Sequence, residues 1–179
     1  MQGINHADPE RISHPLEPVY DARSIILILG SMPSPKSREV GFYYGHPQNR
    51  FWPVMAAVTG QPMPFGTEER KAFLLRNKIA LWDVLASCQI IGADDNSIRD
   101  PIANDIDRIL RATNIRSVFT TGRKASDLYR RFCLPVTQVQ SIYLPSTSPA
   151  NQAIPTSQLI VQYRKILAEN GFSFTDSVW

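Results

Sequence analysis

The chain has 179 residues, of which 43% are hydrophobic and 20% are charged. This length and composition fit a single globular domain with one sizeable core. The formal net charge of +3 permits an anionic partner without requiring one, and the lack of any block of five or more Lys or Arg residues excludes a polybasic tail.

The chain begins with a polar stretch, MQGINHADPERISH, which lacks the apolar segment of a signal peptide. We expect residues 1–22 to form an N-terminal arm and residues 23–179 to form the single domain. No apolar run reaches the length of a membrane span. The isolated Cys88 and Cys133 fit buried thiols in a reducing compartment better than a disulfide or a metal site. We therefore expect a cytoplasmic protein without membrane contacts.

The first predicted strand is the apolar run SIILIL at residues 24–29, which stops at Gly30 and is typical of a strand buried on both faces of a parallel sheet. A polar segment, residues 30–49, follows with neither helical nor strand periodicity. Residues 51–60 have apolar side chains at helical spacing and a terminal glycine. Residues 67–78 begin with a Thr cap and acidic side chains and end basic, so both stretches predict helices.

The second half of the chain continues this alternation. IALWDVL at residues 79–85 predicts a second strand, and residues 87–101 predict an irregular loop. The later elements are a helix at 103–114, a strand at 117–122, a helix at 123–133, a strand at 137–144, an irregular loop at 144–156 and a helix at 156–171. Strands that alternate with helices predict a layered α/β domain with a mostly parallel sheet.

Three polar, irregular segments follow strands of this predicted sheet: residues 30–49, 83–98 and 144–151. Each of them alone could be a simple connection. Ligands in open α/β sheets bind beyond the carboxyl ends of the strands. Because all three segments fall on that same edge, we expect the functional site there.

The sequence lacks the patterns of several cofactor-dependent and hydrolytic enzymes. It has no P-loop, GxGxxG or GxSxG motif, which disfavours a nucleotide cofactor and a nucleophile elbow. The three histidines, His6, His14 and His46, show no metal-ligand spacing. We therefore expect neither a cofactor nor a bound metal.

Aromatic side chains cluster in the first polar segment and just after it. Phe51 and Trp52 fit core packing beneath the segment. Phe42, Tyr43 and Tyr44 lie in a stretch without helical pattern, and we expect at least one of them to present a ring face to a base. Candidates for substrate or phosphate contacts, each with a structural or solvated alternative, are Lys36, Arg38, His46, Arg50, Arg123 and Lys124.

Four pieces of the chain together resemble the DNA-deoxyinosine (hypoxanthine-DNA) glycosylase branch of the uracil-DNA glycosylase superfamily. They are GSMPSPKS (30–37), FYYGHPQNRFW (42–52), ALWDVLASC (80–88) and LPSTSPAN (144–151). The resemblance covers roughly residues 24–172. It implies a three-layer αβα fold with a central, mostly parallel four-stranded sheet, and damaged DNA as the partner. We expect a monomer.

The resemblance also implies roles for individual residues. Asn49 matches the catalytic Asn of this branch, and Asp83 falls where uracil-specific members carry a base-recognising Asn. Many members have a His at the head of the last motif, where this chain has Leu144, so no catalytic His is expected from that loop. The implied base-binding residues are Gly30, Ser31, Met32, Pro33, Phe42, Tyr43, Tyr44 and Asp83. The implied DNA-binding residues are Ser34, Ser37, His46, Arg50, Pro145, Ser146, Thr147, Ser148, Asn151, Arg123 and Lys124.

The implied reaction is hydrolysis of an N-glycosidic bond after the nucleotide leaves the duplex. The Asn49 carboxamide can orient a neutral water but cannot act as a strong base, and a loop-capping role is its alternative. Asp83 either accepts the N1–H of hypoxanthine or bonds to the protein itself. Lys36 is the sole lysine candidate in the pocket loops, so we expect a monofunctional enzyme that leaves an abasic site. A uracil- or mismatch-specific glycosylase and a non-catalytic nucleic-acid-binding module stay open as alternatives.

Overall fold

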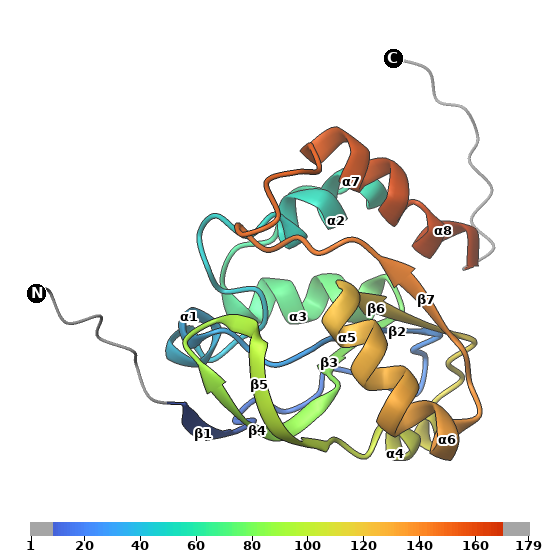
Figure 1. Ribbon diagram of the computed structural model, residues 1–179. Coiled ribbons are helices and arrows are strands. Elements are labelled where there is room, and N and C mark those ends of the chain that lie inside the picture. The colour runs from blue at the N-terminus through green and yellow to red at the C-terminus, as the bar shows by residue number, and fades with distance from the viewer. Residues whose placement is uncertain (1–8, 170–179) are drawn as a thin grey trace, which may run out of the picture.

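A computed structural model describes residues 9–169 of the protein (Figure 1). Its centre is a four-stranded sheet with the strand order β3-β2-β6-β7, in which every neighbouring pair is parallel. The strands are β2 (Ile26–Gly30), β3 (Ile79–Asp83), β6 (Ser117–Thr121) and β7 (Ser141–Leu144). Their carboxyl ends therefore meet at one edge of the sheet, and the predicted fold class is confirmed.

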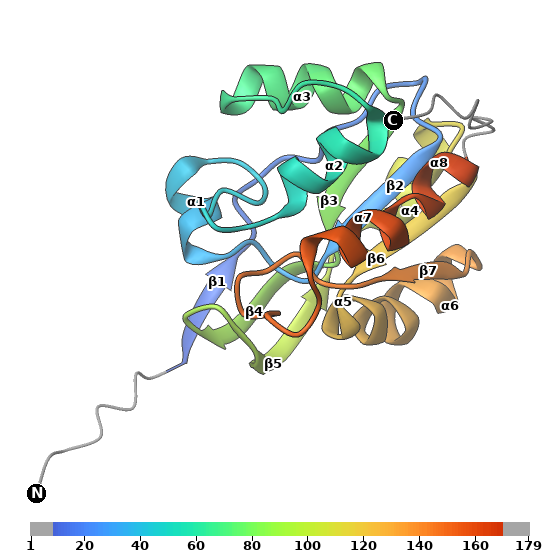
Figure 2. The ribbon, with the colours of Figure 1, turned by 90° about the horizontal axis from the view of Figure 1, so that it is seen from above.

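Helices cover both faces of this sheet, which makes the three αβα layers (Figures 1 and 2). On one face lie α2 (Phe51–Thr59), α7 (Thr156–Tyr163) and α8 (Lys165–Glu169), and on the other lie α4 (Ile106–Ala112), α5 (Arg123–Leu128) and α6 (Leu134–Thr137). A further helix, α3 (Gly66–Arg76), packs along β3. Because both faces are covered, all five residues of β2 are buried, as a continuous apolar strand requires.

The core contains the residues that the sequence placed there. Phe51 and Trp52 at the start of α2 are 0% and 2% exposed, so their predicted core role is confirmed. Cys88 and Cys133 are buried free thiols, also as predicted. Burial raises the pKa of the Cys133 thiol to about 11, which keeps it protonated at neutral pH.

A second, antiparallel sheet corrects the prediction of an irregular loop at residues 87–101. Its strands are β1 (Glu10–Ser13), β4 (Leu85–Ile91) and β5 (Asp94–Ala103), in the order β1-β4-β5. The hairpin between β4 and β5 turns at Gly92, whose φ of 56° suits glycine. The alternation of these strands is interrupted by irregular pairing and by Pro101 on the edge strand, so the strand pattern is weak in the sequence.

Several boundaries also differ from the prediction. The polar segment at 30–49 contains one short helix, α1 (Pro35–Val40), which begins with a Ser34 cap and ends at Gly41. The predicted helix at 123–133 changes into a π-helical turn at Tyr129–Cys133 and continues as α6, so β7 begins only at Ser141. The predicted helix at 103–114 begins at Ile106, and the predicted final helix breaks at Arg164, with its last two positions outside the described residues.

The described part of the predicted N-terminal arm packs against the domain. Strand β1 pairs with β4, and Val19 forms an isolated bridge with Leu81 of β3. The His14 backbone N–H also donates to the Ala86 carbonyl at 2.7 Å. These contacts place the side chain of His14 at the carboxyl edge of the main sheet. Within residues 9–169, no helix has the length and apolar character needed to cross a membrane.

Candidate active site

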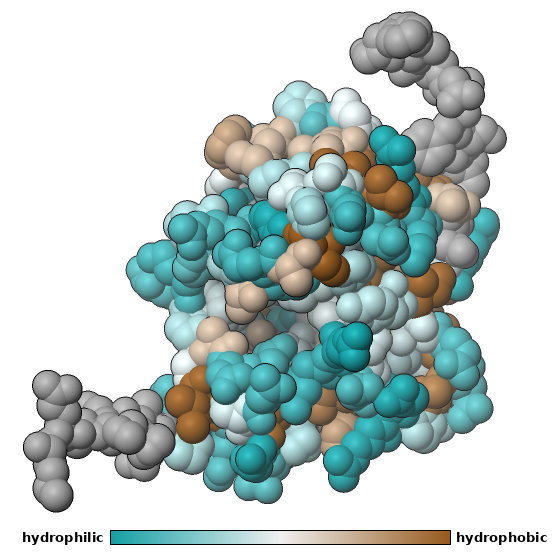
Figure 3. Space-filling view, turned by 45° about the horizontal axis from the view of Figure 1, so that its top comes forward, coloured by the Kyte–Doolittle hydropathy of each residue, from teal (hydrophilic) through white to brown (hydrophobic). Residues whose placement is uncertain are grey.

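A cavity of about 130 Å³ opens at the carboxyl edge of the parallel sheet. Figure 3 shows a hollow on this side of the molecule, within a largely hydrophilic surface. A buried water needs roughly 10–15 Å³ of such space, so the cavity accommodates about ten heavy atoms, which is the size of a purine base. The cavity is therefore large enough for one base.

Most residues that the sequence assigned to base or DNA contacts lie around this cavity. Those that line it are Gly30, Ser31, Met32, Pro33, Ser34, Ser37, Tyr43, Tyr44, Asn49, Asp83, Ser146, Thr147 and Ser148. The predicted residues that do not line it are Phe42, His46, Arg50, Pro145, Asn151, Arg123 and Lys124. The cavity is also lined by five residues that no sequence motif indicated: Ile90, Gly92, Ala93, Asp95 and Thr121.

The side chain of Asn49 is held by its carbonyl oxygen. Asn49 Oδ1 accepts hydrogen bonds from the Phe51 backbone N–H and from the Thr147 hydroxyl, both at 2.9 Å. The first bond closes a turn just before α2, which is the structural role named as the alternative for Asn49, and the second ties Asn49 to the loop after β7. Because both lone pairs of the oxygen are engaged, the amide NH₂ is the group left for a ligand in the cavity.

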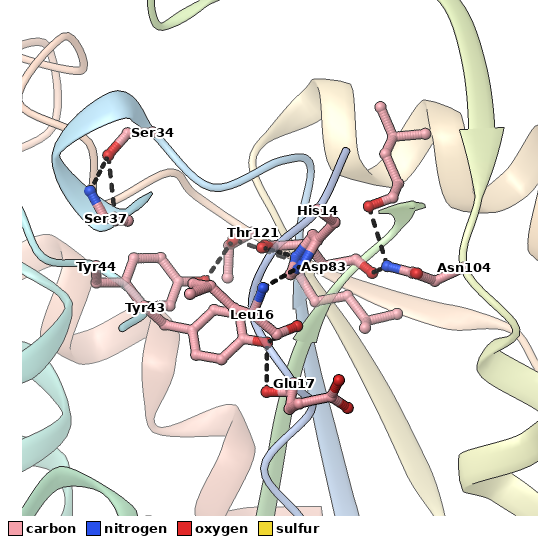
Figure 4. A network of polar contacts seen from close by, with 12 residues as sticks. His14, Leu16, Glu17, Ser34, Ser37, Tyr43, Tyr44, Asp83, Asn104 and Thr121 are labelled. Carbon is pink, nitrogen blue, oxygen red and sulfur yellow. Dashed lines mark hydrogen bonds and ion pairs between the residues drawn. The ribbon is translucent and has the colours of Figure 1, made fainter. Parts of the chain in front are cut away.

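Asp83 ends β3 and forms a buried pair with His14 (Figure 4). The distance from His14 Nε2 to Asp83 Oδ2 is 2.8 Å, and the two side chains are only 3% and 6% exposed. The Asp83 backbone carbonyl accepts a hydrogen bond from Asn104 Nδ2 at 3.0 Å. Asp83 thus bonds to the protein, as one predicted alternative stated, while its side chain also lines the cavity.

Gly30 makes room for the Asp83 carboxylate. The two residues are partners in the register of β2 and β3. A Cβ atom at position 30 would come within 2.3 Å of Asp83 Oδ1, closer than any real contact. A glycine is therefore required at the end of β2, since any larger residue would displace the carboxylate.

The aromatic residues of the first loop take different positions. Phe42 is 4% exposed and stacks on Trp52, so its ring belongs to the core. The Tyr44 ring stacks on Phe51 with centroids 3.8 Å apart, and its hydroxyl bonds to Thr121 at 3.1 Å. The Tyr43 hydroxyl donates to the Glu17 carbonyl at 2.9 Å. Burial, and then the charge of Asp83, raise the pKa of both phenols, so both stay neutral.

The β4–β5 hairpin contributes a second carboxyl group to the cavity. The Ser31 hydroxyl donates to Asp95 Oδ2 at 2.8 Å, which joins the hairpin to the loop after β2. Burial raises the pKa of Asp95, the Ser31 hydrogen bond opposes this shift, and the Asp83 charge adds to it. Asp95 lies in the segment 83–98 that was expected at this edge of the sheet, but no motif in the sequence distinguished its carboxyl group from the other polar side chains there.

Hydrogen bonds from Arg50 stabilise the loop after β7. The Arg50 guanidinium donates to the carbonyls of Asn151 and Ile154 at 2.6 and 2.7 Å. Asn151 Nδ2 in turn donates to the Ser146 carbonyl, and the buried Tyr163 hydroxyl donates to the Pro145 carbonyl, both at 2.8 Å. Arg50 and Asn151 thus shape the loop that carries Ser146, Thr147 and Ser148 to the cavity.

The remaining predicted contacts lie outside the cavity wall. His46 Nδ1 accepts a hydrogen bond from the Gln48 backbone N–H, and Arg123 and Lys124 begin α5. Lys36 forms an exposed ion pair with Glu39. Among residues 9–169, no group of three or more His, Cys, Asp or Glu side chains is arranged to hold a metal ion.

The αβα fold and a base-sized cavity at the carboxyl edge of its sheet define an α/β protein with a small-ligand site at the position usual for such folds. The chain belongs to the uracil DNA glycosylase superfamily, because a sequence model of that family matches residues 17–168. This match includes all four motifs that carried the resemblance.

Individual relatives agree with this assignment. The chain is 37% identical over 113 residues to a hypoxanthine DNA glycosylase of Methanosarcina barkeri (strain Fusaro / DSM 804). This alignment covers 62% of this chain and 71% of the relative. It is 35% identical over 136 residues to a hypoxanthine DNA glycosylase of Methanosarcina acetivorans, and this alignment covers 75% of this chain and 85% of the relative. The expected branch of the superfamily and the expected class of enzyme, a DNA glycosylase, are confirmed.

A solved structure confirms the fold as well. The solution NMR structure of a putative uracil DNA glycosylase from Methanosarcina acetivorans superposes with a TM-score of 0.71 at 30% sequence identity. The superposition covers 85% of this chain and 96% of that chain.

Proposed function

We propose that the protein removes hypoxanthine from DNA by hydrolysing the N-glycosidic bond of deoxyinosine, which leaves an abasic site for base excision repair. The observation that carries this proposal is that Asn49 and Asp83 line one cavity of purine size. The names of the two Methanosarcina relatives support hypoxanthine as the base.

The target nucleotide must leave the duplex to reach this cavity, because the cavity lies at the sheet edge among loops. Base extrusion costs a few kcal/mol and is easiest at a mispair, which a deaminated base creates. In this proposal the loop at residues 145–148 enters the minor groove, and the hydroxyls of Ser146 and Ser148 contact phosphates beside the lesion. The Tyr163 and Arg50 bonds hold that loop in shape beforehand.

Asp83 is suited to recognise the ring nitrogen of the base. Deamination of adenine converts N1 from an acceptor into an N1–H donor. A carboxylate accepts hydrogen bonds and donates none, so Asp83 distinguishes hypoxanthine from adenine at this atom. Tyr43 and Tyr44 remain neutral beside it and add no competing charge.

Asn49 contributes donors to the reaction. Its Oδ1 accepts hydrogen bonds from Phe51 and Thr147, so its NH₂ group is free to donate to a ligand. It either orients the attacking water or stabilises the negative charge that develops on the base. A strong base is unnecessary when the sugar already carries most of the positive charge of the transition state. The rate enhancement then comes from positioning and from fixed dipoles.

The reaction ends at the abasic site in this proposal. A strand-cleaving glycosylase needs an amine that attacks C1′. Among residues 9–169, no lysine lines the cavity, and Lys36 is paired with Glu39 on the surface. The protein is thus proposed to form no Schiff base and to make no strand break of its own.

The test is incubation of the purified protein with duplexes that carry hypoxanthine, xanthine or uracil, followed by alkali to cleave abasic sites. Hypoxanthine duplexes should be cleaved after alkali and remain intact without it. Asn49→Ala should abolish the product, whereas Asn114→Ala, which changes an exposed and remote Asn, should retain it. Preferred release of uracil would favour the uracil-specific alternative, and DNA binding without release of any base would overturn the proposal.

A further inference from the structure

The hydrogen bonds of His14 define which of its ring nitrogens carries the proton. The Leu16 backbone N–H donates to His14 Nδ1 at 3.2 Å, so Nδ1 is an acceptor. The proton of the neutral ring is therefore on Nε2, which lies 2.8 Å from Asp83 Oδ2 (Figure 4). His14 donates this bond, and Asp83 Oδ2 is an acceptor already in use.

The pair is held rigidly from several sides. The His14 ring packs near Tyr43 and edge-on to Trp82, with ring centroids 6.1 and 6.3 Å apart. The His14 backbone is fixed by its bond to the Ala86 carbonyl. Asn104 Nδ2 bridges the carbonyls of Asp83 and Leu85, both at 3.0 Å, and so fixes the corner after β3. These contacts hold the His14 ring and the Asp83 backbone in place, and the bond from His14 orients the Asp83 side chain.

The two oxygens of Asp83 have different surroundings. Oδ2 faces His14, which is buried and does not line the cavity. Oδ1 lies beside Gly30, which does line the cavity. Asp83 therefore offers a ligand one oxygen, Oδ1, as a hydrogen-bond acceptor, because Oδ2 already accepts a hydrogen bond from the His14 imidazole.

This asymmetry has a consequence for base selection. A carboxylate with two free oxygens accepts the N1–H and the 2-amino group of guanine side by side. A carboxylate with one free oxygen satisfies the lone N1–H of hypoxanthine and leaves the guanine amino group without a partner. Adenine presents an N1 lone pair to the same carboxylate oxygen and donates no hydrogen bond to it. An unpaired buried donor weakens binding roughly 5- to 150-fold.

We propose that His14 is a positioning residue that determines base specificity: it holds Asp83 as a single acceptor, so that the cavity takes hypoxanthine and rejects guanine and adenine. This inference rests on the proposed function and adds a residue from the N-terminal segment to the site. Uracil also has one ring N–H, so its selection against hypoxanthine is decided elsewhere in the cavity.

The test measures kcat/KM for release of hypoxanthine and of mispaired guanine by the wild-type protein and by His14→Ala and His14→Gln. His14→Ala frees Asp83 Oδ2, so the ratio of hypoxanthine to guanine release should fall about tenfold or more. His14→Gln keeps a donor for Oδ2 and should restore part of the ratio. Tyr129→Phe removes a buried hydroxyl bond far from the cavity and should leave the ratio unchanged. An unchanged ratio in His14→Ala would overturn the inference.

A second measurement uses the wild-type protein alone and does not depend on the folding of variants. Free hypoxanthine should bind and shift the NMR signal of the His14 Nε2 proton, while free guanine and adenine should leave it in place. Equal shifts with all three bases would overturn the inference. A wild-type protein that releases no hypoxanthine from DNA would overturn the proposed function and the inference together. An active enzyme whose ratio of hypoxanthine to guanine release is unchanged in His14→Ala would overturn the inference alone.

Discussion

Thr147 and Asn49 lie 98 residues apart in the chain, and the Thr147 hydroxyl donates a 2.9 Å hydrogen bond to Asn49 Oδ1. The loop after β7 and the loop before α2 are thereby joined at the cavity wall. With the Phe51 N–H as second donor, this bond defines which end of the carboxamide is available to a ligand. The orientation of Asn49 is thus determined by residues from both loops.

Thr147→Val tests this link. Valine has nearly the same shape as threonine but leaves Asn49 with one anchor instead of two, and loss of such a bond costs about 1 kcal/mol. We expect hypoxanthine release to fall several-fold while the protein stays folded. Thr147→Ser keeps the hydroxyl and should stay close to wild type in a single-turnover excision assay. Equal losses in both variants would show that the methyl group matters and the bond does not.

Gly30→Ala should disable the site. The new Cβ would displace Asp83 Oδ1, and Asp83 cannot retreat because His14 holds it from behind. Misplacing a recognition group by about 1 Å commonly costs about 100-fold in rate. The excision rate measures the loss, and circular dichroism checks the fold.

A double-mutant cycle assigns the cause of that loss. In an Asp83→Ala background the carboxylate is absent, so adding Gly30→Ala should have little further effect. Full additivity of the two losses would contradict the contact between these residues.

Arg50→Lys should loosen the loop that carries Ser146 to Ser148. Lysine cannot donate to the Asn151 and Ile154 carbonyls with one planar fork, and loss of a hydrogen bond to a charged group costs about 1.5–3 kcal/mol. Urea unfolding measures this change. The control Arg111→Lys alters an exposed pair with Asp107 and should change the free energy of unfolding by less than about 1 kcal/mol.

The raised pKa of Asp95 predicts a pH dependence of stability. Because burial raises this pKa, the folded state binds the proton more tightly than the unfolded state. The free energy of unfolding therefore falls as pH rises from about 4 through the folded-state pKa of Asp95. Asp95→Asn keeps an acceptor for Ser31 and removes this titration, so thermal unfolding should show a shallower fall and a higher midpoint at neutral pH. Identical pH slopes for variant and wild type would contradict the shift.

The main sheet could be predicted from the sequence because its strands are continuous apolar runs. Residues 26–29 and 79–85 are buried throughout, and such continuous apolar runs are typical of strands covered on both faces. The β4–β5 hairpin was missed because its strands are half exposed and irregularly paired, so their polar residues resemble a loop. Alternation fails as a signal where bulges shift the register.

The candidate site was predictable where a motif stays local in the chain. Asn49 and Asp83 lie within such motifs, and both line the cavity. His14 and Asp95 were missed because each reaches the site through pairing of the second sheet, over 69 residues to Asp83 and 64 residues to Ser31. Nothing in the polar sequence around His14 distinguishes it from the exposed residues beside it.

The donor role of the Asn49 NH₂ group is tested most directly by the single-turnover rate of hypoxanthine release by Asn49→Asp. Aspartate keeps an oxygen for Phe51 and Thr147 but replaces the NH₂ donors with an acceptor. We predict a rate about 10²–10³ times lower than wild type, with an unchanged unfolding midpoint and with Asn114→Asp as the active control. A rate equal to or above wild type would show that an acceptor at position 49 activates the water, and it would contradict the proposed donor role.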